Sequence, residues 1–172
     1  MRDSKGNLYG TTCAGGAFHN GIVFKLDSNG NETVIFAFVN YSLPSGRLVQ
    51  DSAGNLYGTT QQGGANGSGA VFKISPTGQE TTLYSFNDYG ISDLILDPAG
   101  NLYGTTEGGT HSAGAVFMIS PAGEETVLYS FTGLADGAAP LGGVIRDAAG
   151  NLWGTASGGG IGSNGVIFKL TP

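Results

Sequence analysis

Short stretches in which apolar and polar residues alternate return along the whole chain. One stretch reads Asn-Leu-Tyr-Gly-Thr-Thr and begins at Asn7, Asn55 and Asn101, with Asn-Leu-Trp-Gly-Thr-Ala at Asn151. β-Branched and aromatic residues fill these stretches, and Gly, Asn, Asp, Ser and Pro separate them, which is typical of strands. No stretch shows an apolar period of about 3.6 residues. The pattern therefore predicts an all-β fold with little or no helix.

The strands recur as one unit of roughly 46–50 residues, because equivalent aspartates follow each other at steps of 48, 46 and 50. Each unit is predicted to hold four strands, named here strand A (as in 143–147), strand B (55–60), strand C (71–74) and strand D (80–86). Repeated four-stranded units of this length are typical of β-propeller blades. An open β-solenoid is the alternative, although its repeat is usually shorter.

We predict a single tandem-repeat β domain over residues 1–172, with units of about 1–48, 49–94, 95–144 and 145–172. The chain holds four copies of strands B and C but only three complete D strands, so the first and last blades are predicted to be incomplete. One interpretation is a fragment of a longer array. The other is that exposed strand edges pair with a neighbouring copy, since unpaired edges are templates for pairing.

The turn between strands A and B carries the sequence Asp-x-x-Gly-Asn in every unit. An Asp side chain can accept a backbone N–H two residues further on, and Gly supplies a positive φ, so turn capping is the favoured role. Calcium ligation is the alternative, because carboxylates and turn carbonyls suit that ion, but each turn offers a single carboxylate. The aspartates concerned are Asp3, Asp51, Asp97 and Asp147.

The B–C loops differ from unit to unit, and variable loops on a rigid scaffold are where binding residues usually lie. The histidines, His19 and His111, occupy corresponding loops, so a ligand or metal shared between them is one interpretation. Tyr41 and Tyr89 are further aromatic candidates outside these loops. The loop residues predicted as candidates for ligand binding are Phe18, His19, Asn20, Asn66, His111, Ser112 and Asn164.

Composition and charge exclude several classes of partner. The formal net charge is −6 without a basic stripe, so we expect no nucleic-acid binding. No apolar run approaches the roughly 20 residues of a membrane span, and no signal-peptide stretch follows Met1. Cys13 is the only cysteine, which excludes an internal disulfide.

No arrangement typical of a catalytic site is present, so we predict no catalytic residues, no metal site and no enzyme. The glutamates that begin the D strands recur in three units, which favours a structural role. We expect Glu32, Glu80 and Glu125 to be cross-strand partners of lysines such as Lys25 and Lys73.

The full pattern combines D-x-x-G-N-L-Y-G-T-T, G-G, G-x-V-F-K and G-x-E-T-x-L-Y-S-F. It resembles the bacterial Gloeobacter/Verrucomicrobia-type tandem repeat, also described as the choice-of-anchor GloVer repeat, over essentially the whole chain. The resemblance implies an extracellular or cell-surface protein and brings no catalytic residues with it. More loosely, the strand order is similar to NHL-type and lyase-type propellers.

Three functions follow as expectations. The first is a non-enzymatic repeat protein with a structural or adhesive role that self-assembles head-to-tail, as a ring or filament, through its incomplete terminal blades. The second is a propeller module that binds a carbohydrate or peptide on the face of the variable loops. The third is a propeller lyase or hydrolase, because Trp153 in the motif Gly-Asn-Leu-Trp faintly resembles a feature of such propellers.

Overall fold

The computed structural model describes residues 1–40, 42–87 and 90–171, and the regular structure within them is almost entirely strand. A single turn of 3-10 helix, Ile161–Ser163, is the exception among these residues. The prediction of an all-β fold is confirmed.

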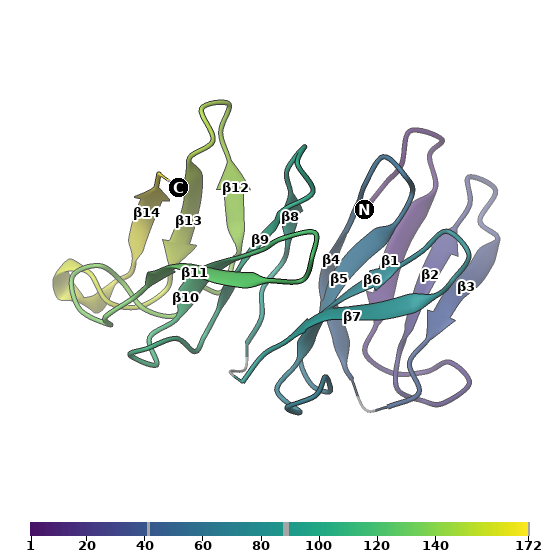
Figure 1. Ribbon diagram of the computed structural model, residues 1–172, viewed down its shortest axis with the longest axis horizontal. Coiled ribbons are helices and arrows are strands. Elements are labelled where there is room, and N and C mark those ends of the chain that lie inside the picture. Colours follow the sequence, from purple (N-terminus) through teal and green to yellow (C-terminus); the bar gives the residue numbers. More distant parts are fainter. Residues whose placement is uncertain (41, 88–89, 172) are drawn as a thin grey trace. The chain divides into compact units, whose positions relative to one another are not determined.

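Four antiparallel sheets follow one another along the chain, one for each repeat (Figure 1). Strands that are neighbours in sequence are neighbours in each sheet, as predicted for the order A, B, C, D. Sheet 1 holds β1 (Leu8–Thr12), β2 (Ile22–Leu26) and β3 (Glu32–Ala37); sheet 2 holds β4 (Pro44–Gln50), β5 (Leu56–Thr60), β6 (Ala70–Ile74) and β7 (Glu80–Ser85). Sheet 3 holds β8 (Ile95–Leu96), β9 (Leu102–Thr106), β10 (Ala115–Ile119) and β11 (Glu125–Ser130); sheet 4 holds β12 (Val144–Arg146), β13 (Leu152–Ala156) and β14 (Val166–Leu170).

The first and last sheets have three strands each, whereas the two middle sheets have four. Sheet 1 contains strands B, C and D, and an isolated bridge between Arg2 and Leu8 stands where strand A would pair. Sheet 4 contains strands A, B and C. The predicted incompleteness of the first and last blades is therefore confirmed.

The chain divides into two compact units, Met1–Asn87 and Asp88–Pro172. The first unit contains sheets 1 and 2, and the second contains sheets 3 and 4. Within each unit the A–B and C–D turns lie at one end of the strands and the B–C loops at the other (Figure 1). The single domain over residues 1–172 stays a prediction.

The core of the first unit forms where sheet 2 packs on sheet 1. Leu56 and Phe72 of sheet 2 are almost fully buried, together with Val23 of sheet 1. The ring of Phe38, just after β3, meets Phe72 edge-on with centroids 5.3 Å apart. Tyr9 packs against the same cluster.

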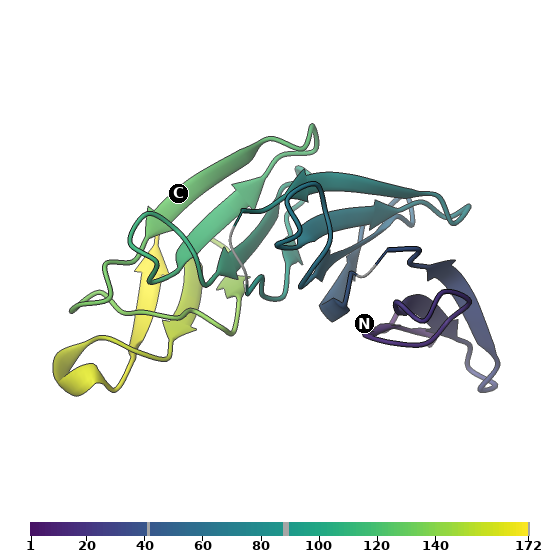
Figure 2. The same cartoon turned by 90° about the horizontal axis from the view of Figure 1, so that it is seen from below.

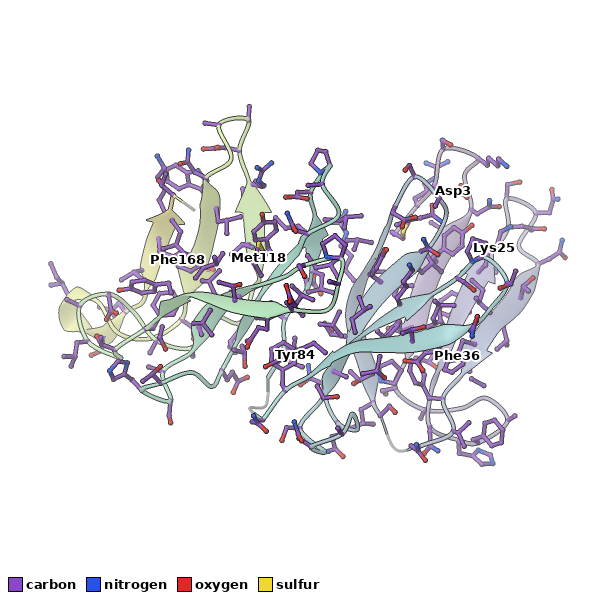
Figure 3. The ribbon with its side chains drawn as sticks, in the orientation of Figure 1. Asp3, Lys25, Phe36, Tyr84, Met118 and Phe168 are labelled. Carbon is purple, nitrogen blue, oxygen red and sulfur yellow. The ribbon has the colours of Figure 1, made fainter. Side chains whose placement is uncertain are left out.

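The second unit repeats this packing with corresponding residues. Leu152 of sheet 4 is buried against Tyr103 and Val116 of sheet 3. The rings of Phe131 and Phe168 lie edge-on at 5.0 Å (Figure 3 labels Phe168). In both units, therefore, the Leu/Phe face of one sheet covers the Tyr/Val face of the preceding sheet, because side chains alternate between faces along a strand.

The glycine of each B strand makes room for the phenylalanine of strand C. Gly104 is in register with Phe117, and a Cβ added to Gly104 would lie 2.7 Å from Cζ of that ring. Gly58 and Phe72 show the same fit in sheet 2. The repeated Tyr-Gly-Thr and Val-Phe motifs are thus two halves of one packing element.

One expectation about strand pairing is wrong. Lys73 pairs with Thr81, while Glu80 pairs with Ile74, so the lysine and glutamate side chains point to opposite faces of sheet 2. In sheet 1, Lys25 pairs with Thr33 and Leu26 with Glu32. In sheet 3, Glu125 pairs with Ile119. Lys73 instead places its ammonium 5.9 Å from the centre of the Tyr57 ring.

Candidate functional site

The carboxylate of each A–B turn is surrounded by four hydrogen-bond donors. In the second repeat along the sequence, Asp51 Oδ1 accepts the backbone N–H groups of Ala53 at 3.0 Å and Asn55 at 2.8 Å. Its Oδ2 accepts the Asn55 amide at 2.7 Å and the Tyr57 hydroxyl at 2.9 Å. The same four contacts recur at Asp3 (labelled in Figure 3), Asp97 and Asp147, where the Trp153 indole replaces the tyrosine hydroxyl.

These contacts bear on the electrostatics of the turn. Hydrogen bonds from the Trp153 indole and the Asn151 amide lower the pKa of Asp147 to about 2. Burial, together with the hydrogen bond to Asp51, raises the pKa of Tyr57 to about 12. An ionised carboxylate offers about four acceptor positions, and here four donors fill them. A calcium ion at these aspartates would have to displace those donors.

Asparagines of two B–C loops donate hydrogen bonds to strand D or to the segment just after it. The Asn20 amide donates to the Val39 carbonyl at 2.6 Å, and the Asn66 amide donates to the Ser85 carbonyl at 3.3 Å. Asn164 lies just after the 3-10 helix and is exposed. Asn20 and Asn66, predicted as binding candidates, thus have a structural contact as well.

The loop histidines lie in different units, His19 in the first and His111 in the second, and both are exposed. Phe18 is half exposed beside His19, and Ser112 is exposed beside His111. His19 and Ser112 both have a positive φ, 60° and 53°. No group of three or more His, Cys, Asp or Glu side chains suited to a metal ion occurs in the part of the chain that the structure describes. Tyr41 and Tyr89 lie outside the described residues.

A cavity in the first unit was missed by the sequence reasoning. It has a volume of about 660 Å³ and lies between β3, the segment that follows it, and sheet 2. Phe36 (labelled in Figure 3), Phe38 and Phe72 form apolar walls. Its polar wall includes Asn40, Ser42, Glu80, Thr82 and Ser85. The aromatic positions of strand D were visible in the sequence, but the gap between two sheets was not.

Sheet 4 leaves one of its faces uncovered. Ile167 is 79 % exposed, whereas its counterparts Val23 and Val116 are fully buried. Trp153 and Ile145 lie on the same face as Ile167. Trp153 pairs with Ile145, and Thr155, two residues after Trp153, pairs with Ile167. Ile145 is 69 % exposed. We call Ile145, Trp153 and Ile167 the tail face; a shallow hollow of about 280 Å³ lies over it.

Sheet 1 leaves the opposite kind of face uncovered. Leu8 is 46 % exposed, whereas its counterparts Leu56 and Leu152 are buried. Phe24 and Leu26 share this face with Leu8 through the register of β1 and β2. We call Leu8, Phe24 and Leu26 the head face. The head face corresponds to the Leu/Phe faces, and the tail face to the Tyr/Val faces, that pack together inside each unit.

No helix among the described residues is both long and apolar enough to cross a membrane. A search of curated proteins gives no match. Among solved structures, a streptogramin B lyase matches with a TM-score of 0.62 and 16 % identity, covering 100 % of this chain and 54 % of that one. A catalytically inactive virginiamycin B lyase from Staphylococcus aureus with quinupristin gives 0.63 and 17 %, covering 100 % and 55 %. A candidate gluconolactonase gives 0.56 and 15 %, covering 79 % and 48 %.

Identities this low show the fold alone. That fold confirms the predicted propeller-like class. The chain spans about half the length of the solved structures it matches. A family model described as the Gloeobacter/Verrucomicrobia repeat matches residues 1–172, in agreement with the repeated turn, the Gly–Phe fit and the four similar sheets. The chain belongs to the Gloeobacter/Verrucomicrobia repeat family.

Proposed function

We propose that the chain is a non-enzymatic structural module of an extracellular or cell-surface protein, and that it joins other copies head-to-tail. The observation that carries the proposal is the match between the head face and the tail face. Each unit already contains one interface of this type, with a Leu/Phe face on a Tyr/Val face. The head face of one copy therefore has the residues needed to cover the tail face of the next.

Apolar burial is the driving force for this contact. Leu8, Ile145 and Ile167 expose large aliphatic side chains, and each such side chain contributes about 1.5–3 kcal/mol when fully buried. A contact between two different faces is heterologous, so it closes a ring or extends a filament. The chain covers 54 % and 55 % of two matched propeller-like chains, which favours a ring closed by two copies. The extracellular location rests on the resemblance to surface-anchored repeat proteins.

The first test replaces an exposed residue of each face with a charged one. Ile167→Glu and Leu8→Glu should both reduce association, because each leaves a carboxylate buried in an apolar contact. Ile161→Glu is the matched control, since Ile161 is 99 % exposed in the B–C loop of the same sheet and belongs to neither face. Light scattering coupled to size exclusion measures the mass. A monodisperse monomer of the unaltered chain at high concentration would contradict the proposal.

The second test distinguishes a head-to-tail contact from a contact between identical faces. The Ile167→Glu chain keeps an intact head face, and the Leu8→Glu chain keeps an intact tail face. Mixing the two variants should restore association, because one complete head-to-tail contact becomes available. If the mixture stays as monomeric as its components, the two faces do not bind each other.

A second candidate function is the binding of a carbohydrate or peptide, and the cavity of the first unit favours it. Phe36 and Phe38 provide aromatic walls, while Glu80 and Thr82 provide polar groups on the other side. Sites for small ligands commonly combine apolar walls with a few polar groups that fix orientation. A glycan and peptide array should give hits that Phe36→Ala abolishes and Phe18→Ala leaves unchanged. An array without hits would rule this candidate out.

A further inference from the structure

Strand β14 pairs on one side only among the described residues. It is paired with β13, and neither view shows another strand beside it in its sheet (Figures 1 and 2). In the other three sheets the C strand pairs on that side with a D strand. These pairings share one register: Val23 with Phe36, Val71 with Tyr84 and Val116 with Tyr129, each followed by a register shift.

The backbone groups on this edge can be assigned from sheet 3. The Thr105 carbonyl accepts the Ser92 N–H at 2.9 Å, so the peptide groups of Thr105 face strand A. Hydrogen-bonded and non-hydrogen-bonded pairs alternate along an antiparallel ladder. Val116, which pairs with Thr105, must therefore direct its own peptide groups toward strand D. Ile167 is the counterpart of Val116, and Lys169 lies two residues further on.

Besides the peptide groups of Ile167 and Lys169, a backbone carbonyl acceptor lies at the start of the edge. The carbonyls of Gly21, Gly69 and Gly114 each accept the N–H of the phenylalanine that ends a D strand, at 3.0, 3.0 and 2.8 Å. Gly165 is the corresponding residue before β14. The edge thus presents Gly165, Ile167 and Lys169 in the order that binds a D strand elsewhere.

A cleft follows the same edge in the second unit. Its volume is about 360 Å³, and it is lined by Tyr129, Phe131, Asp136 and the residues 166–170. In the first unit the corresponding cavity beside Phe36 and Phe38 has β7 as one of its walls, through Glu80, Thr82 and Ser85. The cleft of the second unit therefore has space where a D strand lies in the first.

We propose that the edge of β14 binds an extended peptide with the D-strand pattern Glu-Thr-x-x-Tyr-Ser-Phe. Addition of a strand to an open sheet edge is a known mode of peptide recognition. The tyrosine would stand opposite Ile167 and the threonine opposite Lys169. A second copy of this chain is not the donor, because β3, β7 and β11 are already paired in their own sheets. The edge differs from the tail face, so this inference does not rest on head-to-tail stacking.

The test uses a dye-labelled peptide with the sequence of residues 80–86, Glu-Thr-Thr-Leu-Tyr-Ser-Phe, and the chain carrying Leu8→Glu, which keeps β14 intact while reducing stacking. Fluorescence anisotropy should show saturable binding. A scrambled peptide of the same composition should bind at least about tenfold more weakly, or about 1.4 kcal/mol. Absence of saturable binding, or equal binding of both peptides, would overturn the proposal.

A matched pair of variants tests the edge itself. Lys169→Pro removes the backbone N–H that faces the open edge, and proline is tolerated on edge strands where that N–H is not used. Lys169→Ala removes the same side chain but keeps the N–H. The peptide should bind the alanine variant and lose binding to the proline variant.

Hydrogen exchange provides a measurement on the unaltered backbone, in case the proline variant does not fold. The amides of Ile167 and Lys169 should gain protection when peptide is added to the Leu8→Glu chain. Those of Phe168 should change little, because its peptide groups face β13. Protection elsewhere without protection at Ile167 and Lys169 would place the peptide at another site and refute the assignment.

Discussion

At the scale of single residues, one carboxylate organises the A–B turn because its donors arrive at fixed spacings. Two backbone N–H groups, at positions two and four after the aspartate, reach one oxygen. The side chains at positions four and six reach the other. Asn151 thus contributes both its backbone and its amide to Asp147. The spacing repeated in all four turns is a consequence of this geometry, with a tyrosine hydroxyl or a tryptophan indole as the last donor.

The lowered pKa of Asp147 leads to a prediction about acid stability. Its ordinary value is 3.8 and its folded value is about 2, so its contribution is present above pH 4 and is lost as the pH falls toward 2. Hydrogen bonds also lower the pKa of Asp136 to about 2, so it adds to the same trend. Melting temperatures measured from pH 6 to pH 2 should be steady and then decline below pH 4.

Trp153→Phe is the control for this assignment, because it removes the indole donor but keeps an aromatic ring. In a carboxyl NMR titration the pKa of Asp147 should rise toward its ordinary value, while that of Asp136 stays in place. An unchanged titration of Asp147 would show that the indole is not the group that holds it.

At the scale of elements, strands B and C of one sheet are fitted to each other by the glycine–phenylalanine pair. Phe117 is fully buried and lies against Gly104, where no Cβ intervenes. A buried ring has few alternative positions in a close-packed interior. The pair therefore fixes the position of the phenylalanine ring on its own sheet.

Gly104→Ala should destabilise the chain by about 1–3 kcal/mol, since the added methyl group overpacks a filled site. Gly142→Ala is the matched control: its nearest neighbour would be Thr155 Oγ1 at 3.6 Å, an ordinary contact. Urea unfolding of the two variants measures the difference. Equal stability of both would mean that the ring of Phe117 moves aside freely.

At the scale of the whole molecule, net charge would oppose the head-to-tail contact proposed above. Each copy has a formal charge of −6, so two copies repel each other at low ionic strength. The screening length falls from about 30 Å at 0.01 M salt to about 8 Å at 0.15 M. The proposed contact is apolar and needs no ion pair.

Association should therefore strengthen as salt is raised from 0.01 to 0.15 M, which sedimentation velocity at several protein concentrations can measure. A contact held by ion pairs would show the reverse dependence. The Ile167→Glu chain should stay monomeric across the same range, because screening does not remove the cost of burying its carboxylate.

Much of the fold could be predicted from the sequence because each strand is bounded by a turn with its own chemistry. Asp-x-x-Gly-Asn marks the A–B boundary in all four repeats, and a Ser-Pro or Asp-Ser turn precedes strand D in the first three. The exact register was not predictable, since a register shift follows Val71 and moves every later pair by one. Because of that shift, Lys73 and Glu80 lie on opposite faces of sheet 2.

The candidate surfaces were harder to predict than the strands. Ile167 and Val116 occupy the same place in the repeat and look alike in the sequence, yet one is exposed and the other buried. Their difference arises because sheet 4 covers Val116, whereas none of the described residues covers Ile167 in this way, and the pattern within a repeat does not encode this. The variability of the B–C loops predicts their residues as binding candidates, and for Asn20 and Asn66 the structure shows contacts that hold the loop.

The common register of the three C–D pairings has a consequence for folding kinetics. Because β3, β7 and β11 fit the C strands in the same way, a fourth strand from one repeat is also an acceptable partner for the C strand of another. The five residues between β6 and β7 close a short loop, whereas an exchange between repeats must close a loop several times longer. We therefore expect loop entropy, rather than side-chain identity, to select the correct hairpin during folding, and a lengthened C–D turn to increase exchange between repeats.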